Sequence, residues 1–191
     1  MLYLIGGASR SGKSTLARRL LMERQVPYLS TDILMMGIAN GLPQLGLDPN
    51  DPDVIVGETL GPLLRAMAVN ILETGVTYLL EGATLLPAYV AELIQDHGTG
   101  VEACFIGYAA PDATRKLRDI RVFGGGPNDW VRGHTDDQVL ALIAEMVDFS
   151  TYLRDECTRY HLPYFDNSHD FLGTLDSAFQ HLITPAGETH P

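Results

Sequence analysis

Hydrophobic and polar residues along this chain alternate between two kinds of pattern. Short apolar runs with the length and flanks of buried parallel strands lie at residues 2–6, 27–30, 76–81, 101–107 and 162–165. Between them, apolar residues recur at steps of three and four, which is typical of amphipathic helices, over residues 14–24, 53–74, 86–97, 111–122, 135–160 and 170–183. Strands that alternate with crossover helices predict an α/β fold, a three-layer sandwich with a five-stranded parallel sheet in the middle.

Two segments interrupt this alternation. Residues 40–53 are rich in Gly, Pro and Asp, and residues 123–134 contain a Gly-Gly-Gly-Pro run. In phosphoryl-transfer enzymes such insertions are often substrate flaps and lids; ordinary surface loops are the alternative. We therefore expect a single domain over residues 1–184, with flexible segments near 40–53 and 123–134 and a disordered tail over residues 185–191.

Composition narrows the choice of partners and compartment. The net charge of −11 and the pI near 4.8 argue against a general affinity for nucleic acid or an anionic membrane surface. No apolar run approaches the ~20 residues of a membrane span, and the N-terminus shows no signal-peptide pattern. Cys104 and Cys157 fit reduced structural thiols. We expect a cytoplasmic protein, monomeric or homodimeric, that binds a small molecule.

A phosphate-binding motif follows the first apolar run directly. Its G-x-x-x-x-G-K-S pattern and the next residue are Gly7, Ala8, Ser9, Arg10, Ser11, Gly12, Lys13, Ser14 and Thr15. A strand delivers the loop and a helix receives it, as a phosphate cradle requires. Backbone N–H groups and the positive end of the helix dipole would hold phosphate oxygens, Lys13 would reach the β- and γ-phosphates, and the Ser14 hydroxyl would ligate Mg²⁺. The motif predicts binding of ATP or GTP with Mg²⁺.

Two carboxylates end the next two apolar runs, where parallel strands line a ligand crevice. Asp32 would face the phosphates; it could accept a proton from a substrate hydroxyl or hold the metal through water. A helix N-cap is the alternative interpretation of Asp32. Glu81 has the placement of a carboxylate that orients Mg²⁺, with a simple strand-end acid as its alternative. Gly82 would allow a close approach behind Glu81.

Three arginines recur every third residue just before the second irregular segment. Arg115, Arg118 and Arg121 would share one side of a helix, and guanidinium groups suit phosphate oxygens and charge that develops on a transferred phosphoryl group. We assign a catalytic role to Arg118 and treat the other two as lid or substrate candidates. A solvated face paired with Asp112 and Asp119 is the alternative.

The second irregular segment and the last strand supply further candidates. Arg132 and Trp130, the only tryptophan, are lid or substrate candidates; Trp130 would either cover a ligand or anchor the loop to the core. The run Asp166-Asn167-Ser168 follows the last strand, where related sheets place the loop that contacts adenine.

Residues 6–15, 30–32 and 79–87 together resemble the corresponding motifs of small P-loop kinases. The likeness is to the 2-phosphoglycerate kinase-like group and to bacterial proteins of adenylate-kinase type. The resemblance implies ATP- and Mg²⁺-dependent phosphoryl transfer, with Lys13 and Ser14 on the nucleotide and Asp32 near the acceptor. It does not carry over the acceptor, because the middle of the chain offers only Arg65 and the lid only Arg132 as basic substrate contacts.

These observations predict a kinase that transfers a phosphoryl group to a small-molecule acceptor. A nucleotide-binding regulatory module with slow hydrolysis is one alternative, and an NTPase that uses water as the acceptor is another. The two irregular segments and Asp32 favour the kinase, since a switch needs no acceptor pocket.

Overall fold

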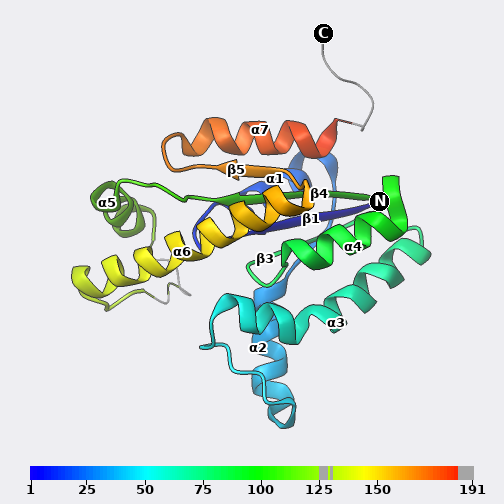
Figure 1. The fold of residues 1–191 in the computed structure, drawn as a ribbon, viewed down its shortest axis with the longest axis horizontal. Coiled ribbons are helices and arrows are strands. Elements are labelled where there is room, and N and C mark those ends of the chain that lie inside the picture. Colours follow the sequence, from blue (N-terminus) through cyan, green and yellow to red (C-terminus); the bar gives the residue numbers. More distant parts are fainter. Residues whose placement is uncertain (125–128, 130, 185–191) are drawn as a thin grey trace.

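The computed structural model describes residues 1–124, 129 and 131–184. These residues form one β-sheet with layers of helices packed against it (Figure 1). The strands are β1 (Leu2–Gly7), β2 (Tyr28–Ser30), β3 (Tyr78–Gly82), β4 (Val101–Gly107) and β5 (Tyr164–Asp166). The helices are α1 (Lys13–Arg24), α2 (Thr31–Gly41), α3 (Asp53–Glu73), α4 (Pro87–His97), α5 (Ala113–Phe123), α6 (Asp136–Tyr160) and α7 (Phe171–Ile183). Short 3₁₀ helices lie at Pro43–Leu45 and Gly98–Gly100.

The five strands form one sheet in the order β2-β3-β1-β4-β5, and every pairing is parallel. This confirms the predicted fold class. The central strand β1 is almost entirely buried, because it pairs with β3 on one side and β4 on the other and is covered on both faces. Parallel strands end at the same edge of a sheet, so the loops after β1, β2, β3, β4 and β5 share one rim.

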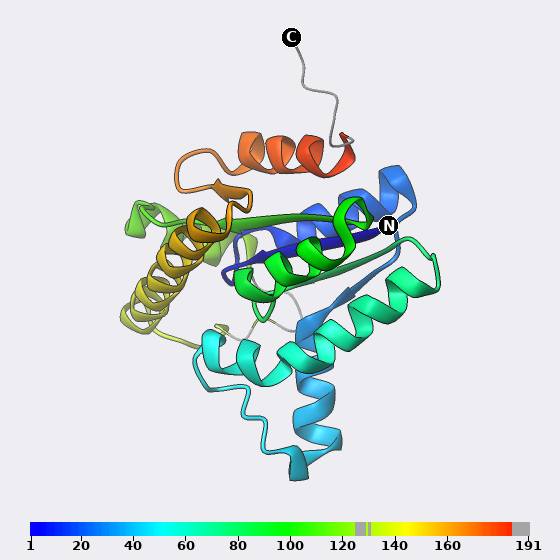
Figure 2. The ribbon, with the colours of Figure 1, turned by 45° about the vertical axis from the view of Figure 1, so that its right-hand side comes forward.

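Two helical layers cover the sheet (Figures 1 and 2). Helices α1 and α7 lie together on one face, over a core that includes Ile5, Leu20 and Phe179. Helices α3, α4 and α6 lie on the other face, over a larger core that includes Leu4 and Phe105. Both views show α2 extending away from the sheet on the side opposite α7.

Helix α3 is the one helix, within the part of the chain that the structure describes, long and apolar enough to cross a membrane by length and composition. This differs from the expectation drawn from apolar runs alone, because helix length and mean hydropathy tolerate scattered polar residues. One third (33%) of the segment is buried, and Val56, Leu60, Leu64 and Ala68 of this helix belong to the larger core. Its apolar character is therefore used at least in part inside the fold.

Differences from the predicted elements lie mainly at boundaries and in one helix. The sequence pattern did not predict α2 as an element, because its residues have no clear apolar stripe and are followed by the Gly- and Pro-rich stretch. Part of the segment 40–53 is the 3₁₀ helix Pro43–Leu45, and Asp53 begins α3. Residues 125–128, 130 and 185–191 lie outside the described residues, so the predicted lid is described only in part and the predicted tail not at all.

Candidate functional site

The loop after β1 has the backbone that phosphate binding requires. Gly7 and Gly12 adopt φ values of 147° and 101°, and a Cβ on Gly7 would lie 2.1 Å from the carbonyl oxygen of Ile106. Helix α1 begins at Lys13 with no side-chain cap and no acidic residue in its first turn. The first N–H groups of a helix have no partner within that helix, so the positive end of α1 is available to an anion.

Four consecutive carbonyl oxygens of this loop each accept a hydrogen bond from a side chain. The pairs are Lys13 Nζ to Ala8 O (2.8 Å), Tyr108 Oη to Ser9 O (2.7 Å), Lys116 Nζ to Arg10 O (3.0 Å) and Asn167 Nδ2 to Ser11 O (2.5 Å). We call Tyr108, Lys116 and Asn167 the loop clamp. They come from the end of β4, from α5 and from the end of β5. Because the clamp fixes the carbonyl groups, it also fixes the direction of the N–H groups that a phosphate would use.

Lys116 contacts a second member of the loop clamp as well as the loop. Its ammonium group lies 3.7 Å from the centroid of the Tyr108 ring, a cation–π geometry. Burial lowers the pKa of Lys116 from 10.5 to about 8; Asp119 raises it and Arg10 lowers it further. Sequence reasoning did not select Lys116; the one signal that could have marked it is that the chain contains only two lysines, Lys13 and Lys116.

Lys13 lies among three carboxylates at the same rim. The Lys13 side chain is 7% exposed, and burial lowers its pKa below the usual 10.5, while the charges of Asp32, Glu81 and Asp53 oppose this shift. These carboxylates come from the first turn of α2, the end of β3 and the first turn of α3. The structure therefore brings the predicted Lys13, Asp32 and Glu81 together.

Glu81 has a direct contact with the metal-binding candidate Ser14. The Ser14 hydroxyl donates a hydrogen bond of 3.1 Å to Glu81 Oε1. Burial raises the pKa of Glu81 above its usual 4.5, whereas Lys13 and hydrogen bonds from Ser14 and Ser30 lower it. An acid that is 2% exposed, that accepts a hydrogen bond from a hydroxyl and that lies in the field of a lysine is suited to neutralisation by a cation.

Gly82 keeps the end of β3 close to α2, as the sequence suggested. A Cβ on Gly82 would lie 1.7 Å from Oγ1 of Thr31, which no side chain could tolerate. Thr31 in turn accepts a hydrogen bond of 2.7 Å from Thr84. This packing places Asp32, the next residue after Thr31, at the rim beside Glu81.

The alternative interpretation of Asp32 as a helix cap is wrong. Ser30 is the N-cap residue of α2, and Asp32, whose side chain is exposed, is the second residue of the helix.

Asp53 was missed because it belonged to the segment interpreted as a flap. It is half-buried, and burial raises its pKa above the usual 3.8, with Asp32 acting in the same direction and Lys13 opposing. The signal in the sequence that could have identified Asp53 is the pair Pro52-Asp53 at the start of a long helical pattern.

A cavity of about 600 Å³ lies next to the loop, on the side of the loop clamp. Its lining includes the side chains of Arg10, Thr15, Tyr108, Arg115, Lys116, Asn167, Ser168, His169, Phe171 and Leu172. The volume is in the range of small-molecule sites. Asn167 and Ser168, from the loop after the last strand, thus lie beside the phosphate loop and line a cavity there.

The predicted arginines of α5 have three different surroundings. Arg115 lines the cavity, and its Nη1 lies 3.5 Å from the carbonyl oxygen of His169. Arg121 instead bonds Asp136 at 2.8 Å and the carbonyl of His134 at 2.6 Å. Arg118 is exposed and does not line the cavity.

The described part of the predicted lid contacts the phosphate loop through one ion pair. Arg10 of the loop bonds Asp129, and Asp129 Oδ1 also accepts from the Val131 N–H at 3.2 Å. Arg132 is exposed, and Trp130 lies outside the described residues.

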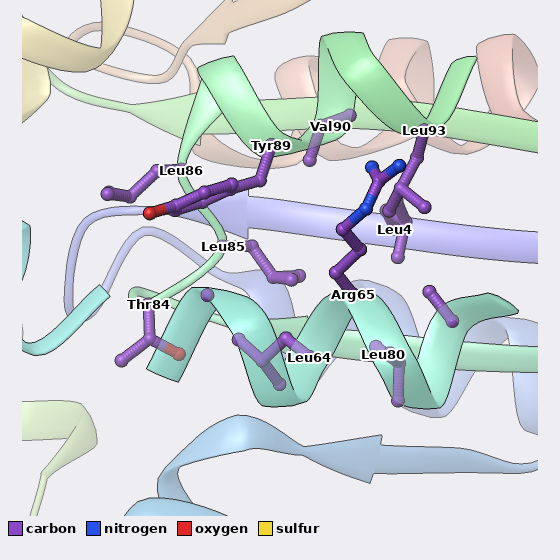
Figure 3. A pocket seen from close by; sticks show the side chains of 12 residues that line it. Leu4, Leu64, Arg65, Leu80, Thr84, Leu85, Leu86, Tyr89, Val90 and Leu93 are labelled. Atoms are coloured by element: carbon purple, nitrogen blue, oxygen red, sulfur yellow. The ribbon is translucent and has the colours of Figure 1, made fainter. Parts of the chain in front are cut away.

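Arg65 lies away from the phosphate loop, between α3 and α4 (Figure 3). Its guanidinium group bonds Asp96 at 2.6 Å and lies 3.6 Å from Glu92. The structure therefore places this predicted substrate contact in an inter-helix ion pair.

The donor set at the rim fits a magnesium ion that is also held by nucleotide phosphates. No group of three or more His, Cys, Asp or Glu side chains that could hold a metal alone occurs among the described residues. Mg²⁺ is commonly bound through one or two protein ligands plus substrate phosphates and water. The contact between Ser14 and Glu81, at the start of α1, provides that smaller set.

Comparison with known proteins agrees with this geometry at the level of the fold. No protein-family model matches the chain. A stretch of 48 residues is 46% identical to a cytidylate kinase of Acidiphilium cryptum (strain JF-5), but it covers only 25% of this chain and 23% of that protein.

Solved structures similar to nearly the whole chain include several small kinases. A shikimate kinase from Bacteroides thetaiotaomicron has a TM-score of 0.55 at 14% identity, over 95% of this chain and 96% of that one. A gluconokinase from Sinorhizobium meliloti 1021 has a TM-score of 0.56 at 15% identity, over 94% and 90%. A sugar kinase from a Janibacter species has a TM-score of 0.56 at 19% identity, over 99% and 98%. The chain has the fold of the small P-loop kinases.

Proposed function

We propose that this protein transfers the γ-phosphoryl group of ATP to a hydroxyl group of a small molecule, with Mg²⁺ as the metal. The observation that supports this most is the convergence of Asp32, Asp53 and Glu81 on Lys13, beside a phosphate loop whose helix has no cap. A site for nucleotide binding alone needs the loop and one metal-orienting acid. Two further carboxylates at the same rim suit a site that also activates an acceptor.

The loop and the cavity would share the nucleotide between them. Backbone N–H groups of residues 7–15 would hold the phosphates, and Lys13 would neutralise charge on the β- and γ-phosphates. The 600 Å³ cavity would take the base and ribose, with Arg115 and Ser168 among its polar lining groups. Whether the base is adenine or guanine depends on that lining; we propose ATP because the resemblance is to ATP-dependent kinases.

Ser14 and Glu81 would hold the metal, Ser14 directly and Glu81 through water or its contact with Ser14. When bound, Mg²⁺ would supply positive charge that offsets the charge developing on the phosphates during transfer. Glu81 can only play this part as a carboxylate, and the nearby Lys13 favours that form.

Asp32 would act on the acceptor. Its exposed carboxylate lies at the rim in the first turn of α2, where it would accept the proton that the attacking hydroxyl loses. Asp53 would share this work, either by orienting the same hydroxyl or by fixing Asp32. Arg118, Arg121 and Arg132 remain proposals for charge stabilisation when the lid closes; Arg115, which lines the cavity, is the arginine best placed to meet phosphate oxygens.

The experiment is a measurement of ATP consumption by the purified protein, with and without pools of small hydroxyl compounds, and with Lys13→Ala as the inactive reference. We expect consumption that depends on an added pool and disappears in the variant. Equal consumption with and without every pool would instead support the NTPase alternative. ATP binding without consumption would support the regulatory module.

A further inference from the structure

Basic residues are distributed very unevenly along the chain. Arg65 is the only Arg or Lys between residues 25 and 110, a stretch that contains ten Asp and Glu residues. This stretch forms β2, α2, α3, β3, α4 and β4. It supplies Asp32 and Asp53, the two carboxylates assigned above to the acceptor, and we call the rim around them the acceptor side.

The one basic residue of this stretch, Arg65, already pairs with acidic residues of α4. Arg65 bonds Asp96 at 2.6 Å and lies near Glu92 across the gap between α3 and α4. Figure 3 shows its side chain running from α3 toward α4, away from Thr84 at the other end of the same small void. The void measures about 10 Å³, room for one water at most. Arg65 therefore does not provide an anion site for an acceptor.

The basic residues nearest the phosphate loop contact groups on the nucleotide side. Arg10 bonds Asp129, Lys116 bonds the carbonyl of Arg10 and lies over Tyr108, and Arg115 lines the 600 Å³ cavity. Lys13 would be occupied by the phosphates themselves. Residues 25–110, which form the acceptor side, thus supply an acceptor at Asp32 with no Arg or Lys other than the paired Arg65.

The acceptor side offers carboxylates and apolar surface instead. Around Asp32 and Asp53 along the chain, α2 and the segments up to α3 expose large apolar side chains, which are Ile33, Met36, Leu42, Leu45 and Ile55. Kinases whose acceptors carry phosphate or carboxylate need a cation to bind that group, most often an arginine fork. Here a second anion would face Asp32 and Asp53 across the rim, where like charges repel.

We propose that the acceptor is a hydroxyl compound that carries no negative charge, either neutral or with a protonated amine. This inference rests on the proposed kinase function. In the reaction the acceptor hydroxyl oxygen forms a bond to the γ-phosphorus, the bond from that phosphorus to the bridging oxygen breaks, ADP leaves, and the hydroxyl proton passes to Asp32. The ammonium group of a cationic acceptor would lie against the carboxylates, and apolar parts of the molecule against the exposed side chains of α2.

The test separates acceptors by charge. A small-molecule extract is divided by ion exchange at pH 7 into anionic, neutral and cationic fractions, and each fraction is incubated with the protein, Mg²⁺ and ATP labelled with ¹⁸O in the γ-phosphoryl group. Mass spectrometry then identifies the molecule that gains the labelled group. We expect labelled product from the neutral or the cationic fraction. Product from the anionic fraction alone would overturn this inference and leave the kinase function standing, whereas no product from any fraction would refute the kinase function and this inference with it.

A pair of variants tests whether the acids themselves set the preference. The identified acceptor and its analogue with one added carboxylate are compared by kcat/KM, and we expect the wild type to prefer the compound without the carboxylate by about tenfold or more. Asp53→Asn should reduce this ratio several-fold even if it slows both reactions. Glu58→Gln, the same change at an exposed position one turn along α3, should leave the ratio as it is. A ratio unaffected by Asp53→Asn, or equal use of both compounds by the wild type, would contradict the proposal.

Discussion

The two sides of the phosphate loop are built in different ways. On the nucleotide side, the loop clamp holds three loop carbonyl groups through residues of α5 and residues that directly follow β4 and β5. The cavity of about 600 Å³ there is lined by Arg10, Arg115 and Lys116 as well as by Asp112 and Asp119. On the acceptor side, the supports are the packing of Gly82 against Thr31 and a hydrogen bond from Thr84, and the charges are negative. The side that would hold the nucleotide is fixed by hydrogen bonds from several elements. The acceptor side includes α2, which extends away from the sheet (Figure 1).

The difference corresponds to the two ligands that the two sides would bind, the nucleotide and the acceptor. Phosphates of a nucleotide are the same in every kinase of this fold, so a rigid loop held by several elements serves all of them. An acceptor varies from one enzyme to the next, and a projecting helix with few ties to the core can change its surface at little cost in stability. The following variants test the two sides separately.

The largest effect should come from Lys13→Ala. The loop would lose the lysine that lies near Asp32, Glu81 and Asp53, so kcat should fall by about 10³–10⁵, and ATP binding should weaken as well. Calorimetric titration with ATP and Mg²⁺ and a coupled assay measure the two effects. Arg18→Ala, an exposed charge loss on the same helix, is the control. Undiminished ATP binding in Lys13→Ala would show that the loop is not the phosphate site.

Asp32→Asn and Asp53→Asn should lower activity without loss of nucleotide binding. If Asp32 is the base, its variant should lose about 10²–10⁴ in kcat, and Asp53→Asn should lose less. The Kd for ATP should stay within a few-fold of the wild type in both, because neither residue belongs to the nucleotide side. The reverse order of the two losses would assign the base to Asp53.

Lys116→Met should have a moderate effect with a defined pH dependence. Without the bond to the Arg10 carbonyl, KM for ATP should rise by roughly tenfold, because the loop is less well oriented. Folding lowers the pKa of Lys116 from 10.5 to about 8. Between these values the unfolded chain retains a proton that the folded chain has released, so this group makes the free energy of unfolding rise with pH.

The stability comparison isolates that contribution. Urea unfolding gives the free energy of unfolding of the wild type and of Lys116→Met between pH 7.5 and 10. The wild-type value minus the variant value should increase with pH by on the order of 1 kcal/mol, allowing for solvent screening. Arg159→Met, an exposed change on α6, should give a difference independent of pH. A constant difference for Lys116→Met would mean that this lysine titrates normally.

The smallest effect on turnover should come from Asn167→Ala. The Ser11 carbonyl would lose its buried partner, and the free energy of unfolding should fall by about 1–3 kcal/mol, with a change in kcat of only a few-fold. Asn40→Ala removes an exposed amide hydrogen bond to Met36 and should lower stability much less. Equal losses in the two variants would show that the loop clamp adds no stability at this position.

The sequence predicted the five-stranded parallel sheet between two layers of helices, and it placed Lys13, Asp32 and Glu81 at one rim of that sheet, because these features follow from local patterns. The apolar run before Gly7 and the acids at Asp32 and Glu81 need only the rule that parallel strands end at one rim. The loop clamp and Asp53 were not predictable in that way. Tyr108 and Lys116 meet the loop across about a hundred residues of chain, and no periodicity records such a contact.

The destination of the γ-phosphoryl group tests the central claim most directly. With ATP labelled with ¹⁸O in that group, the wild-type protein is given Mg²⁺ and the acceptor found by charge fractionation. We predict that the label appears in the phosphorylated acceptor in an amount equal to the ADP formed, and that Lys13→Ala transfers none. Label found only in inorganic phosphate, at the same rate with and without the acceptor, would contradict the kinase function.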